Sequence, residues 1–170
     1  MTQLRRGVVG AIAAFVVVSL SFSAQAGEKK KITETHKSGP IISQTAVYPG
    51  DDPNHEVVMF VRRDTTTSSD PDHNETEEMV YGQNDSVAGT GTARGYFRRF
   101  FKNGDTYYGS YEGTFKTTVK EDGSLGTTWE GTYKVTGGTG KFKNIKGDGT
   151  YRGKATAEGA STEFEAEVEY

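Results

Sequence analysis

The sequence predicts an all-β domain, a small closed antiparallel up-and-down barrel of about eight strands. Apolar and polar residues alternate with a period of two over several segments, which is the pattern of half-buried strands. Turn dipeptides such as Asn103-Gly104 separate these segments. No segment after residue 26 shows the 3.6-residue spacing of an amphipathic helix. Closure of the sheet into a barrel is expected because it leaves no exposed edge strand.

Residues 1–26 have the three parts of a secretory signal peptide. Arg5 and Arg6 precede an apolar run over residues 7–20, and Ala24-Gln25-Ala26 supplies a cleavage site before Gly27. The apolar run is short for a membrane span, and no second apolar stretch follows it. We therefore expect export to the periplasm or the medium, without a membrane helix in the mature chain.

Charge and cysteine content exclude several function classes. Loss of Arg5 and Arg6 with the signal peptide moves the net charge from −3 to −5. A mildly acidic chain gains no attraction to phosphate backbones, so nucleic acid is not an expected partner. The sequence has no cysteine, which excludes disulfides, thiolate metal sites and a cysteine nucleophile.

The sequence divides the mature chain into two expected parts, a polar segment over residues 27–54 and a barrel domain over residues 55–170. The polar segment contains one or two short strands, at 32–38 and 41–47, and whether it joins the barrel stays open. Turn residues from Tyr48 to Pro53 precede a strand over 55–64. Residues 64–78 read as a mobile polar loop. Residues 80–101 form strands with a break near Asn84-Asp85.

The later elements follow a regular order of strands and hairpins. After Asn103-Gly104 a strand over 107–119 leads to a turn at 121–123, and strands over 125–135 and 145–155 follow. A last turn at 158–160 precedes residues 161–170, where apolar residues alternate with four glutamates. Together with the earlier segments this gives the seven or eight strands of the predicted barrel.

A four-residue pattern, acid-Gly-Thr-aromatic, occurs at 112–115, 130–133 and 148–151, at intervals of 18 residues. On a strand the glycine and the aromatic share the apolar face, and the acid and threonine share the other. The repeated glycines let the sheet coil and leave room for rings from across the interior. The repeat therefore indicates a building plan rather than an active site, with Glu112, Glu130 and Asp148 pointing outward.

The aromatic face either fills the core or lines a cavity that stacks a planar or acyl ligand. The candidate ligand-binding residues are Phe97, Tyr107, Tyr111, Phe115, Trp129, Tyr133 and Tyr151. Arg94, Arg98 and Arg99, with Arg62 and Arg63 on another strand, either decorate the exposed wall or form a rim that attracts a carboxylate-bearing ligand.

Other chemistry has little support in the sequence. His36, His55 and His73 lie in separate segments without metal-ligand spacing, so no metal site is expected. The acidic loop over 70–78 lacks the spacing and central glycine of a calcium loop. No serine has the G-x-S-x-G context, and the glycine-rich motifs open no helix that would hold a phosphate. We expect no cofactor.

Residues 89–170 resemble the allene oxide cyclase-like barrels of the calycin type, which include the plant dirigent proteins. The resemblance is carried by GTGTARGYF, by YYGSYEGTF after the Asn-Gly turn, and above all by GGTGKFKNIKGDGTY. It implies an eight-stranded barrel with an apolar cavity and a homo-oligomer, since the plant members are often trimers. In the cyclases the cavity directs a reactive substrate without a cofactor, helped by a carboxylate and an ordered water. No residue here matches that catalytic set, so the catalytic residues are unknown.

We expect an exported soluble barrel that binds a small apolar or amphipathic molecule in its interior. A cofactor-free cyclase or isomerase is the alternative, and a buried ionisable side chain facing the cavity would favour it. A barrel with a filled core that acts through its surface is another. In a further alternative, an outer-membrane barrel, Phe164, Ala166, Val168 and Tyr170 would face lipid and the glutamates the lumen.

Overall fold

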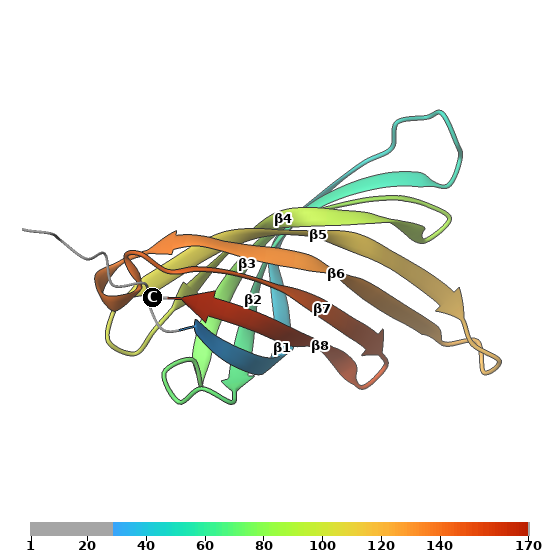
Figure 1. The fold of residues 1–170 in the computed structure, drawn as a ribbon. Coiled ribbons are helices and arrows are strands. Elements are labelled where there is room, and N and C mark those ends of the chain that lie inside the picture. Colours follow the sequence, from blue (N-terminus) through green and yellow to red (C-terminus); the bar gives the residue numbers. More distant parts are fainter. Residues whose placement is uncertain (1–28, 170) are drawn as a thin grey trace, which may run out of the picture.

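The computed structural model describes residues 29–169, which form a closed antiparallel barrel of eight strands (Figure 1). Each strand pairs with its neighbour in the chain, and β8 closes the barrel against β1. The strands are β1(Lys29–Val47), β2(His55–Ser68), β3(Thr76–Val87), β4(Thr90–Phe100), β5(Thr106–Val119), β6(Leu125–Gly138), β7(Lys146–Thr156) and β8(Gly159–Glu169), with a short 3₁₀ helix η1(Gly140–Phe142) between β6 and β7. The predicted all-β up-and-down barrel is confirmed, and the predicted signal peptide lies outside the described residues.

Strand β1 settles the question that the sequence left open, because it is the strand that closes the barrel. Residues 29–37 pair with β8, and residues 34–47 pair with β2. The sequence predicted one or two short strands here, whereas the structure has one strand with a bulge, and the register with β2 shifts between Ser38 and Ser43. Pro40 lies within this bulge, where its missing N–H interrupts no regular ladder bond.

The hairpin turns fall where glycines adopt the left-handed conformation. Gly104 and Gly123 have φ of 85° and 80°, as their predicted turns require. The break expected near Asn84-Asp85 is displaced, because β3 continues to Val87 and the turn is made by Ala88 and Gly89, with φ of 49° and 76°. Two successive positive φ values are what a tight two-residue hairpin needs, so the turn forms there rather than at Asn84.

One end of the barrel is closed by packed aromatic residues. The β2–β3 connection over residues 69–75 and η1 cover this end, and each inserts an almost fully buried ring, His73 from the connection and Phe142 from η1. Phe101, Tyr107 and Ile145 complete the plug. The prediction of a mobile loop over residues 64–78 is therefore mostly wrong. Its first residues belong to β2, its last to β3, and Asp64, Thr66, His73, Thr76 and Glu78 point into the interior.

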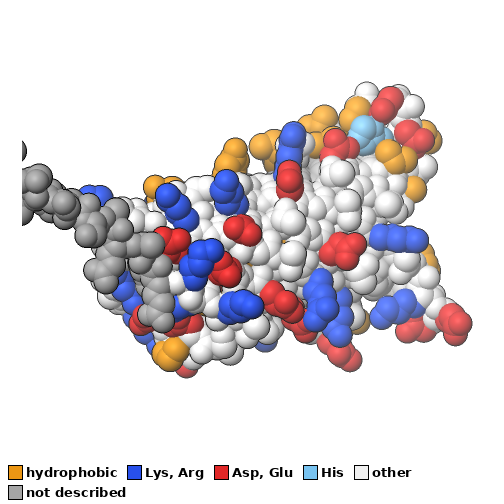
Figure 2. All heavy atoms as spheres, in the orientation of Figure 1, with side chains coloured by type: hydrophobic (Ala, Val, Ile, Leu, Met, Phe, Trp, Pro, Cys, Tyr) orange, Lys and Arg blue, Asp and Glu red, His pale blue; other side chains and the backbone are white. Residues whose placement is uncertain are grey.

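The opposite, open end carries four hairpins, after β1, β3, β5 and β7. Exposed apolar side chains gather here, and Figure 2 shows hydrophobic atoms at the end that carries the β1–β2 hairpin. These side chains are Ile41, Ile42, Val47, Tyr48, Val87, Val119 and Leu125. Over the rest of the face in Figure 2, basic and acidic side chains are interspersed. Within residues 29–169 no helix has the length and apolar character needed to cross a membrane.

Candidate functional site

The barrel interior contains a cavity of about 470 Å³ between the closed and open ends. Its wall carries aromatic rings from β2 and from β4 to β8. The aromatic lining residues are Phe60, Phe97, Tyr111, Phe115, Trp129, Tyr133, Tyr151 and Phe164. All the candidate ligand-binding residues except Tyr107 thus lie together around one space. Tyr107 is 3% exposed and belongs to the plug at the closed end.

The glycines of the repeat lie against these rings, as the building-plan interpretation requires. A Cβ on Gly113 or Gly131 would meet the Tyr151 hydroxyl, and one on Gly149 would meet the Tyr133 ring. Phe97, Tyr111 and Trp129 are accommodated in the same way by other glycines. The acids of the repeat, Glu112, Glu130 and Asp148, are exposed on the outer wall.

An interior charge cluster of Glu34, His36, Glu78 and Arg99 separates the cavity from the plug. Each of the four is at most 6% exposed. Arg99 Nη1 donates to Glu34 Oε1 at 2.6 Å, and its Nε and Nη2 donate to Glu78 Oε2 at 3.2 and 3.1 Å. His36 Nε2 lies 3.1 Å from Glu34 Oε2, and its Nδ1 lies 3.5 Å from Glu78 Oε1. His36 and Glu78 line the cavity, whereas the Arg99 guanidinium lies over the Tyr107 ring in the plug.

Arg99 therefore corrects the predicted rim. Strand alternation places Phe97 and Arg99 inside, and Arg94 and Arg98 on the exposed outer wall. There Arg94 Nη2 donates to Gln83 Oε1 at 3.2 Å, and the Arg98 guanidinium lies over the Phe100 ring. The three arginines do not converge at the cavity mouth. Strand alternation was the signal that could have revealed these buried charges. Arg99 lies two residues after Phe97, and Glu78 lies two residues before Val80, so each shares the inward face of its apolar neighbour.

A second ion pair, between Arg62 and Asp64 of β2, also lines the cavity. Arg62 Nε and Nη2 donate to the two Asp64 carboxylate oxygens at 2.8 and 2.9 Å. The backbone N–H of Gly39 donates to Asp64 Oδ1 at 3.2 Å. A two-point pair of this kind is geometrically specific and holds both side chains in place.

Burial and neighbouring charges shift the pKa values of these groups. Burial raises the pKa of Glu34, but Arg99, His36 and His73 outweigh it and hold that pKa well below its usual range. Burial and the Arg99 guanidinium, whose Nη2 lies 2.7 Å from His36 Nε2, lower the pKa of His36, but the carboxylates of Glu78 and Glu34 outweigh them and raise it above its usual value. For Asp64 burial prevails over Arg62 and raises the pKa. Burial also raises the pKa of Tyr111 to about 12, so this cavity tyrosine stays neutral.

Two histidines converge in a way that the sequence did not predict. His36 and His73 both contact the Glu34 carboxylate, at 3.1 and 3.2 Å. His55 lies apart at the open end, between Asp51 at 2.6 Å and Asp85 at 2.9 Å. In the described part of the chain no three His, Asp or Glu side chains are arranged to hold a metal ion.

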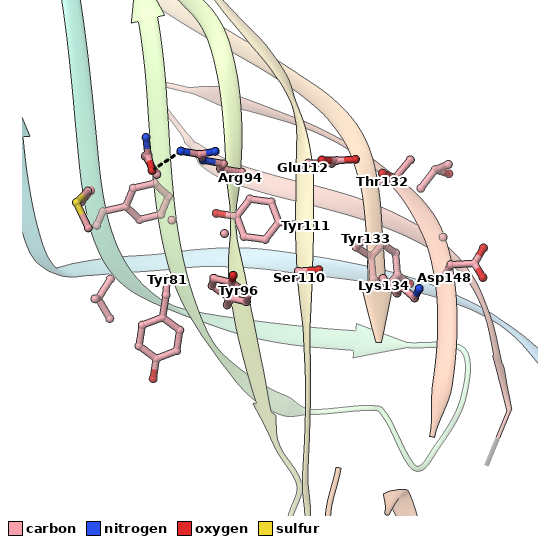
Figure 3. Close-up of a pocket in the computed structure, with 18 of the residues that line it drawn as sticks. Tyr81, Arg94, Tyr96, Ser110, Tyr111, Glu112, Thr132, Tyr133, Lys134 and Asp148 are labelled. Carbon is pink, nitrogen blue, oxygen red and sulfur yellow. Dashed lines mark hydrogen bonds between the residues drawn. The ribbon is translucent and has the colours of Figure 1, made fainter. Parts of the chain in front are cut away.

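A larger groove, of about 1160 Å³, lies on the outer wall (Figure 3). Its labelled side chains include Tyr81, Arg94, Tyr96, Glu112 and Lys134, from β3 to β6. These side chains are largely exposed, with Tyr96 at 70%. A molecule in this groove would stay in contact with water, whereas the interior cavity would bury most of a small ligand's surface. The interior is the better candidate site.

Comparisons with known proteins do not identify a family for this chain. No known family matches the sequence, and no curated protein matches it. The chain is similar in structure to two pterocarpan synthase dirigent proteins. PsPTS1 is 16% identical with a TM-score of 0.46, over 86% of this chain and 97% of the other. GePTS1 is 18% identical with a TM-score of 0.45, over 95% and 99%. Membership of the allene oxide cyclase-like group stays a prediction.

Proposed function

We propose that this protein is an exported soluble barrel that binds a small amphipathic molecule in its interior. The observation that carries the proposal is a cavity inside the barrel with aromatic rings along its wall and an ionisable floor of His36, Arg62, Asp64 and Glu78. Its volume of about 470 Å³ lies within the range of small-molecule sites, which are mostly apolar with a few convergent polar groups. Rings bury large apolar area at low entropic cost, and the floor fixes the orientation of a polar end.

The two ends of the barrel differ in a way that supports entry of the ligand from the open end. Packed side chains such as Phe142 fill the closed end, so a ligand reaches the cavity from the open end. Apolar side chains exposed there, such as Val119 and Leu125, favour the approach of an apolar molecule.

The outer wall supports a soluble protein over an outer-membrane barrel. Phe164 and Val168 face the interior, whereas Glu163, Glu165 and Glu167 face outward on β8. A membrane barrel requires the opposite arrangement, with an apolar outer band. Export itself rests on the signal peptide predicted over residues 1–26.

A cofactor-free isomerase or cyclase is the second candidate function, and the cavity floor favours it. Asp64, Glu78 and His36 are ionisable, buried and lie along the cavity. Burial raises the pKa of Asp64, which brings this carboxyl closer to the range of a general acid or base. Catalysis would use the same bound molecule, so binding is the property to test first.

The test is native mass spectrometry of the chain purified from the periplasm without detergent, followed by extraction and identification of bound molecules. We expect a mature chain beginning at Gly27 that stays soluble and carries one apolar or amphipathic passenger per barrel. A chain that needs detergent would contradict the soluble assignment. A soluble chain that carries nothing and takes up no added apolar probe would contradict interior binding.

A further inference from the structure

We propose that the interior site takes a ligand whose inner end donates hydrogen bonds, as an alcohol or an amine does, and rejects a carboxylate at that end. This inference rests on the proposed function and names the chemical class of the ligand. It replaces the expectation that arginines attract a carboxylate-bearing molecule.

The charges that line the cavity leave no positive excess for an anion. The ionisable side chains facing the space are His36, Arg62, Asp64 and Glu78, apart from the neutral tyrosines. With His36 neutral they carry one positive and two negative charges, and with His36 protonated they balance. Arg99 and Glu34 behind them add one charge of each sign. His73 contacts Glu34 from the plug and does not line the cavity.

The cations are also already paired. Both oxygens of Asp64 accept from Arg62, and Arg99 is shared by Glu34 and Glu78. A ligand carboxylate beside Arg62 would therefore lie next to Asp64 and bury a charge without its own counter-ion, which is unfavourable. Reversing such a ligand would place its apolar tail on the floor, where it would leave the carboxylates desolvated and without new partners.

The floor instead offers acceptors. Glu78 Oε2 accepts two bonds from Arg99, but its Oε1 has His36 Nδ1 at 3.5 Å as its contact. That distance is long for a hydrogen bond. An ionised carboxylate has about four lone-pair sites, so both Glu78 and Asp64 retain acceptor capacity toward the cavity. A hydroxyl or ammonium group of a ligand that reaches the floor would donate hydrogen bonds to the unused lone pairs of these two carboxylates.

The experiment compares three probes that share one body: 4-butylbenzyl alcohol, 4-butylbenzylamine and 4-butylbenzoate. Trp129 reports binding because it is the only tryptophan in the sequence and its ring lines the cavity. Its indole N–H donates to Thr162 Oγ1 at 3.1 Å, so a ligand that displaces this contact changes the emission. Titrations are made near neutral pH and repeated by calorimetry.

We expect the alcohol or the amine to bind, and the benzoate to bind at least about tenfold more weakly. If the amine binds more tightly than the alcohol, the cavity floor carries a net negative charge. If the two bind equally, the floor is neutral. Both results support the inference. A benzoate that binds as tightly as the alcohol would overturn it, while leaving interior binding intact. If none of the probes binds, interior binding itself fails.

Asp64→Asn provides the matched test, because it removes the counter-charge of Arg62 with little change in shape. Benzoate affinity should rise by about tenfold or more relative to wild type. Asp148→Asn, an exposed change on the outer wall, should leave all three affinities unchanged. A folded Asp64→Asn variant whose benzoate affinity stays at the wild-type value would contradict the charge argument. If this variant fails to fold, the wild-type ranking of the probes decides.

Discussion

Gly153 on β7 lies directly opposite Trp129 on β6, and any side chain at Gly153 would occupy the space of the indole ring. The pair shows how the barrel makes its cavity. A residue without a side chain on one strand lets a large ring on the next strand lie flat along the wall. The ring then both lines the ligand space and fixes the curvature of the sheet.

Gly153→Ala should destabilise the fold by about 1–3 kcal/mol, because the added methyl group overpacks the Trp129 site. It should also shift Trp129 emission. Gly126→Ala is the control, since a Cβ there meets only the flexible end of Lys120. Urea unfolding should place this control within about 0.5 kcal/mol of wild type. Equal stability of the two variants would refute the packing role of Gly153.

Arg99→Met should cost about 3–5 kcal/mol, because it leaves the buried carboxylates of Glu34 and Glu78 without their shared cation. The neighbouring Arg98→Met changes an exposed residue of the outer wall and should fall within about 0.5 kcal/mol of wild type. Urea denaturation of both variants measures the difference. Similar losses for the two would show that the interior charge cluster does not hold the fold.

Stability should pass through a maximum in mildly acidic solution. The pKa values of Glu34 and Glu78 lie below their usual 4.5, so their contribution is present above about pH 4.5 and is lost as the pH falls. The pKa of His36 lies above its usual 6.5, so its contribution is complete below that pH and is lost as the pH rises through the folded value. The pKa of Asp64 is raised in the folded state, so protonation of Asp64 favours folding and offsets part of the stability that is lost in acid.

The alkaline decline can be assigned by comparing two histidine variants. Hydrogen bonds that His55 donates to the Asp85 and Asp51 carboxylates also raise the pKa of His55, but this side chain lies at the open end and is better screened. His36→Gln should remove most of the loss of unfolding free energy above about pH 6.5, and His55→Gln a smaller share. An unchanged slope in His36→Gln would contradict the role of the buried carboxylates.

Ala93→Phe should weaken binding of 4-butylbenzyl alcohol by about tenfold or more, because Ala93 lines the cavity and the added ring would fill part of it. Thr92→Phe adds the same ring to the outer face of the same strand and should leave binding unchanged. Trp129 fluorescence titrations compare the two. Equal affinity of Ala93→Phe and wild type would place the ligand elsewhere.

The sequence predicted the strand order, the barrel and which residues of β5 to β8 share a face, because period-two alternation and Gly-containing turns are local signals. Which face points inward was left open. The sequence also predicted that Tyr111, Trp129 and Tyr151 share one face. It could not predict that they surround a cavity while Tyr107 fills the plug. That difference depends on how η1 and the β2–β3 connection cover one end.

The polar floor was missed for a related reason. Glu34, His36, Asp64 and Glu78 lie in segments whose composition indicates solvent exposure, and Arg99 follows another arginine. Their burial is stable only because the closed sheet brings β1, β3 and β4 to the same level, where opposite charges pair. Such pairing is a long-range property. In the sequence, burial of these residues was indicated only by their positions in the inward–outward alternation of their strands.

The most direct test of interior binding is a crystal structure of the mature chain with 4-butylbenzyl alcohol. We expect the ligand inside the barrel, with its ring beside Trp129 and Tyr151 and its hydroxyl near Asp64 or Glu78. A ligand in the outer groove between Tyr96 and Lys134, with an empty interior, would contradict interior binding.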